Sequence, residues 1–168
     1  MHDVWARLGC CILKFCHTGH RNAMSDLFLA FDYGERRVGV AMGDASIGIA
    51  HPVKTIVYKT SRILMGEIEC IVNEWNPSAL VVGMPRHDQD RPHPLEKRVN
   101  RFCKTLESRF KLMVHVIDES YTSFEADQFL VANKLGWEKR KKVIDMVAAQ
   151  LILEDFFSTS IKEDKTLA

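Results

Sequence analysis

The sequence predicts one α/β domain, in which a mixed five-stranded sheet is flanked by helices. Two observations indicate this fold. Three strand-like runs follow one another with short gaps, as in an antiparallel meander, and amphipathic helical stretches then alternate with buried strands. A crossover helix between strands of one sheet makes those strands parallel. The expected order β-β-β-α-β-α-β-α-α therefore gives both antiparallel and parallel pairs.

The first three strands form the meander. Leu27–Tyr33 is an almost continuous apolar run, as expected for a strand that is buried on both faces. A short turn over residues 34–36 leads to a second strand over Arg37–Met42. The third strand, Ala50–Tyr58, contains Pro52 near its start, which favours an edge position because proline cannot donate a hydrogen bond to a neighbouring strand.

Two amphipathic helices and two strands follow. The first helix stops before Pro77, Ala79–Met84 is a short buried strand, the second helix follows Pro94, and Met113–Asp118 is the fifth strand. The helical stripes are spaced by three or four residues. They are Leu64, Ile68, Ile71, Val72 and Trp75 in the first helix, and Leu95, Val99, Phe102, Leu106 and Phe110 in the second.

Helical signals continue to the end of the domain. Thr122 and Glu125 form a capping box for a helix that extends to about Asn133. We expect a basic connector over Lys134–Lys142 and a last helix over Val143–Phe157. Residues 24–158 are thus predicted to be the domain, and residues 159–168 a polar tail.

Residues 1–23 differ from the rest because they have no helical or strand period. We interpret them as a disordered extension, or as residues before a true start at Met24. Cysteines and histidines in this segment suggest zinc, but their spacing matches no zinc-binding pattern. They are Cys10, Cys11, Cys16, His17 and His20.

The overall charge balance is neutral. Lys and Arg total 23 against 22 Asp and Glu, which excludes a protein that holds nucleic acid by bulk positive charge. A local basic patch remains open, and the clearest one contains Lys139, Arg140, Lys141 and Lys142; its alternative is a solvated run of charges. No apolar run is long enough to span a membrane and no signal peptide is evident, so we expect a cytoplasmic protein.

Acidic residues are the strongest candidates for chemistry. Asp32 interrupts an apolar strand, which is costly unless the carboxylate is paired or binds a metal, although an aspartate at a strand end can also cap a turn. Asp118 and Glu119 end the fifth strand. Because strand side chains alternate between faces, the two are not expected to point into one site.

Asp145 lies near the start of the last helix, where a negative charge also suits the helix dipole. Ala148 and Ala149 follow on the same helical face, and their small size lets the helix approach the sheet closely. Gly34 and Gly39 lie near Asp32, and glycines there allow a backbone or a phosphate to come close.

Carboxylates from a first strand, a later strand end and a last helix would form a site with oxygen ligands only. Such a site suits Mg²⁺ or Mn²⁺ better than zinc. These ions hold a phosphodiester and activate water for its hydrolysis.

Four segments in this order resemble the motifs of the YqgF/RuvX family, the RuvC-like proteins that are described as pre-16S rRNA nucleases. They are Phe31-Asp32-Tyr33-Gly34 with Val38-Gly39-Val40-Ala41, Val81-Val82-Gly83-Met84-Pro85, Asp118-Glu119-Ser120-Tyr121-Thr122-Ser123, and Asp145–Leu153. The resemblance implies an RNase H-like fold. It also implies that Asp32, Glu119 and Asp145 are catalytic and bind the metal, and that the activity is maturation of the 5′ end of small-subunit rRNA, with Holliday junction cleavage as the older alternative.

The sequence departs from the family pattern at two places. Ser120 stands where the family usually has Arg, and the loop after Pro85 lacks the usual Asn and Gly-Thr residues. Arg86 in that loop is a candidate contact for nucleic acid, as is Gly34. We expect structured pre-rRNA, branched DNA or ribosomal particles as partners, and no membrane.

Two other classes compete with a nuclease. Actin-like ATPases and sugar kinases also begin with Asp-x-Gly on a hairpin, but they need a duplicated domain for which 168 residues leave no room. A non-catalytic ribosome-assembly factor of the same fold is the other alternative, and the three acids argue against it.

Overall fold

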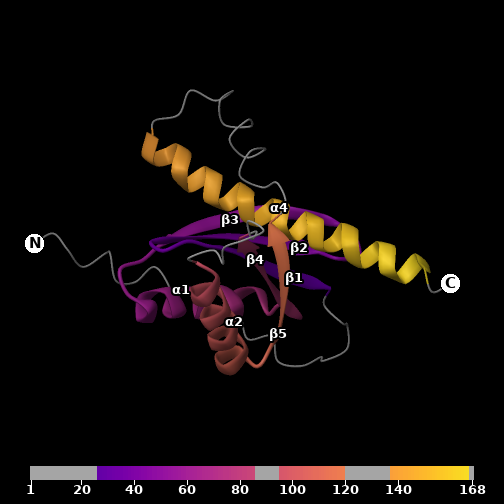
Figure 1. Cartoon of the computed structure of the whole chain (residues 1–168), viewed down its shortest axis with the longest axis horizontal. Helices are drawn as coiled ribbons and strands as arrows, with labels where there is room; N and C mark the ends of the chain where they lie inside the picture. Colours follow the sequence, from indigo (N-terminus) through magenta and orange to yellow (C-terminus); the bar gives the residue numbers. More distant parts are fainter. Residues whose placement is uncertain (1–25, 86–94, 120–136, 167–168) are drawn as a thin grey trace, which may run out of the picture.

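The structure, a computed structural model, describes residues 26–85, 95–119 and 137–166. They form one five-stranded sheet with helices on both faces (Figure 1). The elements are β1 (Leu27–Tyr33), β2 (Arg37–Asp44), β3 (Ile49–Val57), α1 (Ser61–Trp75), β4 (Ala79–Pro85), α2 (Glu96–Phe110), β5 (Met113–Glu119) and α4 (Trp137–Thr166).

The strands lie in the order β3-β2-β1-β4-β5. β1 pairs antiparallel with β2, and β2 with β3, whereas β4 runs parallel to both β1 and β5. This order and these directions are those of an RNase H-like sheet, so the predicted fold class is confirmed. β3 is an edge strand, as Pro52 indicated. The register shifts there, because Val40 pairs with Lys54 but Ala41 pairs with Pro52, which leaves Val53 as the extra residue of a β-bulge.

The sheet has a core on each face. α1 and α2 cover one face, where Phe31 and Leu80 pack with helical residues such as Ile68 and Leu106. α4 crosses the opposite face (Figure 1), and its residues there, including Phe157, pack on a smaller cluster. The remaining members of the smaller cluster are Ala30, Ala50, Val81, Ile152, Leu153 and Phe156.

The predicted strands agree with the structure to within two residues at their ends, and the two predicted helical stripes lie within α1 and at α2. α1 begins after Thr60, whose hydroxyl accepts a hydrogen bond from the Ile63 amide, and it ends at Asn76 in the left-handed conformation. The stop before Pro77 is therefore confirmed.

The predicted extent of the last helix is wrong at both ends. α4 spans Trp137–Thr166, so residues 137–142 of the expected connector and residues 159–166 of the expected tail are helical. The physical reason is propensity. Glu, Lys and Arg are good helix formers, and neither glycine nor proline interrupts the chain between Trp137 and Thr166.

Several predictions lie outside the described residues. These are the segment 1–23, the loop that contains Arg86, the capping box at Thr122 and the position of Ser120. None of the helices in the described ranges combines the length and the hydropathy that crossing a bilayer requires.

Candidate active site

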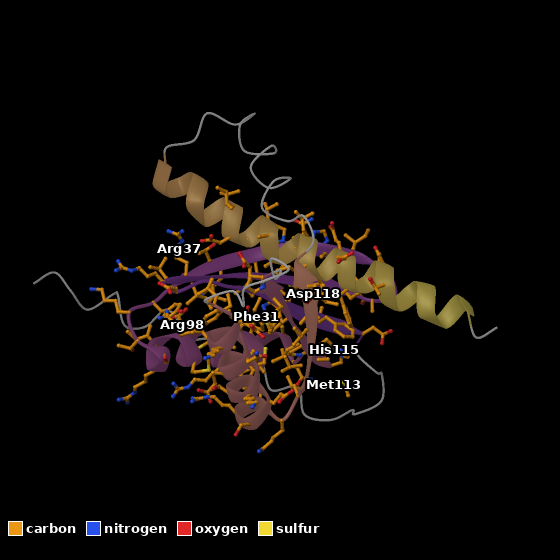
Figure 2. All side chains as sticks on the ribbon, in the orientation of Figure 1. Phe31, Arg37, Arg98, Met113, His115 and Asp118 are labelled. Carbon is orange, nitrogen blue, oxygen red and sulfur yellow. The ribbon has the colours of Figure 1, made fainter. Side chains whose placement is uncertain are left out.

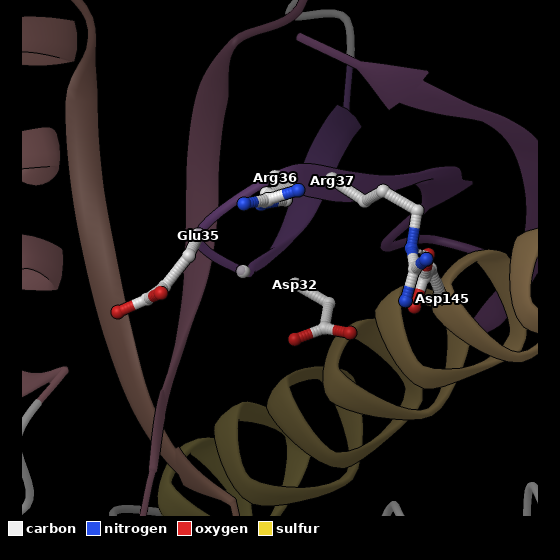
Figure 3. Close-up of a pocket in the computed structure, with 6 residues that line it drawn as sticks. Asp32, Glu35, Arg36, Arg37 and Asp145 are labelled. Carbon is white, nitrogen blue, oxygen red and sulfur yellow. Dashed lines mark hydrogen bonds and ion pairs between the residues drawn. The ribbon is translucent and has the colours of Figure 1, made fainter. Parts of the chain in front are cut away.

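A pocket of about 290 Å³ opens where β1, the turn after it and α4 meet (Figure 3). It is lined by Asp32, Gly34, Glu35, Arg36, Arg37 and Asp145. Two of the three acids expected from the sequence therefore share one pocket, although they lie on the first and the last described elements.

Asp32 reaches the pocket because of strand alternation. Phe28 and Ala30 belong to the core under α4, and Asp32 is the next residue of β1 on that face. Figure 3 shows its carboxylate directed towards α4. Asp32 is half-buried and pairs with Gly39 of β2. The polar residue in an apolar strand is thus placed at a cavity and not in the core.

Gly39 sets how closely α4 lies on the sheet. A Cβ atom built on Gly39 would overlap the backbone of Asp145, so the main chain of the helix rests directly on β2. Ala148 and Ala149 are buried one turn further along. The expected close approach of this helix is confirmed, and Gly39 admits a backbone rather than a phosphate.

Arg37 pairs with Asp145 across this contact. Its Nε donates a hydrogen bond to Asp145 Oδ2 at 2.7 Å, and the two residues are 108 positions apart in the sequence. The side chains of Arg37 and Asp145 are 36% and 18% exposed, so water screens this pair only partly. Sequence reasoning missed Arg37. Its signal is that it precedes Gly39 by two residues and therefore shares the strand face that meets α4.

Hydrogen bonds hold the turn that carries the two arginines. The Gly34 amide donates to the Arg37 carbonyl at 2.9 Å, and the Tyr58 amide donates to the Arg36 carbonyl at 3.1 Å. The Tyr58 hydroxyl donates to the Gly34 carbonyl at 2.7 Å. Burial raises the pKa of Tyr58, and a hydrogen bond with Tyr33 adds to this shift, so the hydroxyl stays protonated and remains a donor.

Gly34 is needed by the turn itself. A Cβ atom there would lie 2.8 Å from the Arg37 carbonyl oxygen, which is closer than real Cβ contacts. Glu35 projects away from Asp32 in Figure 3. Its carboxylate accepts a hydrogen bond from Arg98 Nη1 of α2 at 2.7 Å, and both side chains are more than half exposed.

The other two candidate acids, Asp118 and Glu119, belong to β5, which is separated from β1 by β4. His115 stacks near Phe28 and Phe156 on the face that α4 covers, and Ile117 packs on the same cluster. Asp118 is exposed and labelled in Figure 2 near the end of β5. The strand ends at Glu119, which pairs with Pro85, and its side chain is outside the part that the structure describes.

The remaining predicted contacts are placed only in part. Gly34 lines the pocket. Lys139, Arg140, Lys141 and Lys142 form part of α4 on the N-terminal side of Asp145, where the structure describes the backbone alone. Arg86 lies outside the described ranges.

The donor set suits a hard cation. Asp32 and Asp145 offer carboxylate oxygens, the ligands that Mg²⁺ and Mn²⁺ prefer. Among the described side chains, no three His, Cys, Asp or Glu gather closely enough to hold a metal ion. The described part of the pocket therefore offers two carboxylates that fit such an ion.

Known proteins resemble this chain over most of its length. The model of the RuvX family, described as Holliday junction resolvase, matches residues 26–159. A protein of Nitrosospira multiformis named "Putative pre-16S rRNA nuclease" is 40% identical over 129 residues, which are 77% of this chain and 85% of that protein. A protein of Chromobacterium violaceum with the same name is 43% identical over 130 residues, 77% of this chain and 95% of that protein. Among solved structures, T. thermophilus RuvC in complex with a Holliday junction substrate aligns with a TM-score of 0.49 and 12% identity, covering 80% of this chain and 95% of that one.

Proposed function

Since the chain belongs to the RuvX family, we propose that it is a metal-dependent endonuclease that hydrolyses phosphodiester bonds while the 5′ end of pre-16S rRNA matures. One observation carries this proposal. Asp32 of β1 and Asp145 of α4 line the same pocket, beside two arginines. Carboxylates for a cation and guanidinium groups for a phosphate are the two parts that a phosphodiesterase needs.

Asp32, Glu119 and Asp145 are the proposed ligands of Mg²⁺ or Mn²⁺. Alternation along β5 supports Glu119 over Asp118, because residue 119 falls on the strand face of His115 and Ile117, which packs towards α4. The bound ion would supply Lewis acidity at the phosphoryl oxygen and a water of lowered pKa.

The protein's own cations would bind and orient the substrate. Arg36 and Arg37 line the pocket and suit the anionic oxygens of a phosphodiester. Lys139, Arg140, Lys141 and Lys142 precede Asp145 on α4 by three to six residues, so at a rise of about 1.5 Å per residue their backbone lies within about 10 Å of the site along the helix axis. We propose that these residues, together with Arg86 and Gly34, contact the nucleic acid backbone.

The substrate is proposed from the relatives, whose name specifies pre-16S rRNA. An RNA precursor of the ribosome also implies a cytoplasmic protein. A four-way DNA junction is the second candidate, which the description of the family model favours.

The test compares the two substrates directly. Purified protein is incubated with pre-16S rRNA that retains its 5′ extension, or with a four-way DNA junction, in Mg²⁺, Mn²⁺ or chelator. We expect cleavage of the RNA, dependent on metal. A junction that is cut while the RNA stays intact would assign the second function, and cleavage that persists in chelator would contradict the metal.

Variants test the ligands. Asp32→Asn, Glu119→Gln and Asp145→Asn should each lower the cleavage rate by about 10²-fold or more, while circular dichroism shows that they stay folded. Asp118→Asn is the matched control, because it removes an exposed carboxylate one residue from Glu119, and we expect near wild-type activity. Near wild-type activity in two of the three ligand variants would refute the assignment.

A further inference from the structure

The Arg37–Asp145 ion pair lies inside the pocket that the proposed function assigns to a metal. Arg37 Nε and Asp145 Oδ2 are 2.7 Å apart, and in Figure 3 the guanidinium group lies directly beside the carboxylate. The two backbones that carry this contact are held in place. Arg37 is anchored by its carbonyl to the Gly34 amide, and the Asp145 backbone rests on Gly39.

The charges that line the pocket indicate the role of Arg37 in the protein without metal. The pocket lining contains three carboxylates, on Asp32, Glu35 and Asp145, and two guanidinium groups, on Arg36 and Arg37. Arg98 neutralises Glu35 at the rim. Arg37 contacts Asp145, so it offsets part of the negative charge that Asp32 and Asp145 bring to the pocket in the protein without metal.

We propose that Arg37 occupies the place of the metal ion and exchanges partners when the ion binds, an inference that rests on the proposed function. A dication held by Asp145 would meet a guanidinium charge at ion-pair distance, and like charges so close repel. Arg37 therefore competes with the ion for Asp145. Its side chain is long and more than a third exposed, so it is free to turn towards the pocket mouth.

The released guanidinium would then serve the substrate. With Arg36 already at the pocket lining, Arg37 would add a second bidentate donor for phosphate oxygens. This order makes phosphate binding depend on prior metal binding, because Arg37 stays engaged with a carboxylate until the ion displaces it. Arg37 is thus a residue that links metal loading to substrate binding.

The experiment measures metal binding without any nucleic acid. Mn²⁺ alone is titrated calorimetrically into the full chain, into Arg37→Gln and into Arg98→Gln. Both variants remove one guanidinium beside a carboxylate that lines the pocket, but only Arg37 contacts a proposed ligand. We expect Arg37→Gln to bind Mn²⁺ about tenfold more tightly, equivalent to about 1.4 kcal/mol, and Arg98→Gln to stay within about twofold of wild type. Asp145→Asn in the Arg37→Gln background should abolish the gain.

Each result decides the matter. Unchanged or weaker Mn²⁺ binding by Arg37→Gln would refute the proposal that Arg37 competes with the ion for Asp145. Weaker binding would show instead that Arg37 holds Asp145 in position for the ion. If Mn²⁺ binds wild type and binding is lost when Asp145→Asn is added to Arg37→Gln, the metal site of the proposed function stands even where Arg37 does not compete with the ion. No Mn²⁺ binding to any variant would overturn both.

Discussion

Gly39→Ala should displace α4 and damage the pocket more than it damages the fold. The added methyl group would overlap the Asp145 backbone. A backbone cannot rotate away as a flexible side chain can, so either the helix or β2 has to shift. Overpacking costs about 1–3 kcal/mol, and we expect the upper end of this range. At about 2–4 °C per kcal/mol for a chain of this size, the melting temperature should fall by roughly 6–12 °C.

The effect on activity should be larger still. Asp145, a proposed metal ligand, lies at the point of overlap, and a misplacement of about 1 Å in an active site can cost about 10²-fold in rate. Thermal unfolding and metal-dependent cleavage, each normalised to folded protein, measure the two effects separately.

Two other glycines provide controls. Gly66→Ala in α1 adds a methyl group that meets nothing within 4 Å, so it should stabilise the protein by about 0.5–1 kcal/mol and leave cleavage unchanged. Gly43→Ala meets side-chain atoms of Leu153 and Phe157 and the Ile49 carbonyl, away from Asp145. It should destabilise the fold with a smaller loss of activity. A Gly39→Ala protein that melts and cleaves like wild type would refute this account of how α4 is seated.

Two further predictions concern charge and thiol chemistry. The double variant Lys141→Ala, Lys142→Ala should bind duplex nucleic acid with a weaker salt dependence and unchanged Mn²⁺ affinity. The slope of the logarithm of the binding constant against the logarithm of the salt concentration should fall by about two units, at about 0.9 per phosphate. An unchanged slope in fluorescence anisotropy titrations would show that these lysines are only solvated. Burial, with a smaller effect of Glu107, raises the pKa of Cys103 to about 11 from 9.0. Of the two cysteines that the structure describes, iodoacetamide at pH 8 should therefore modify the exposed Cys70 before Cys103. The Cys103 thiol loses its proton at a lower pH in the unfolded chain than in the folded protein. The free energy of unfolding should therefore fall as the pH rises from about 9 to about 11. A Cys103→Ala variant that shows the same fall would contradict this.

Much of the fold was predictable because its signals are local. Alternation and apolar runs identify the strands, and the glycine-free and proline-free stretch after Gly136 explains why α4 begins earlier than expected. The apolar stripe marks where a helix is buried and not where it ends. α4 continues after Phe157 into a mostly polar run up to Thr166, which carries no apolar stripe in the sequence.

The site was predictable where a charged residue interrupts an apolar segment of the sequence. Asp32 stands out in an apolar strand, and its place in the pocket agrees with the expectation. Arg37 is an ordinary polar residue at the start of a strand, and its one local signal is that it lies two residues before Gly39 on the same strand face. Its partner Asp145 is 108 residues away, and only the packing of α4 on Gly39 brings the two together.

The position of α4 also has a consequence for the order in which the site can form. A chain is made from its amino end, and domains fold as their segments become available. Asp32 belongs to the first strand, whereas Asp145 and the apolar residues that pack on the smaller cluster of the sheet belong to the last helix. A nascent or prematurely terminated chain would expose the rest of that cluster and lack the second carboxylate. Synthesis thus delivers Asp145, a proposed metal ligand, and the last part of the core together, so we expect an incomplete copy to lack nuclease activity.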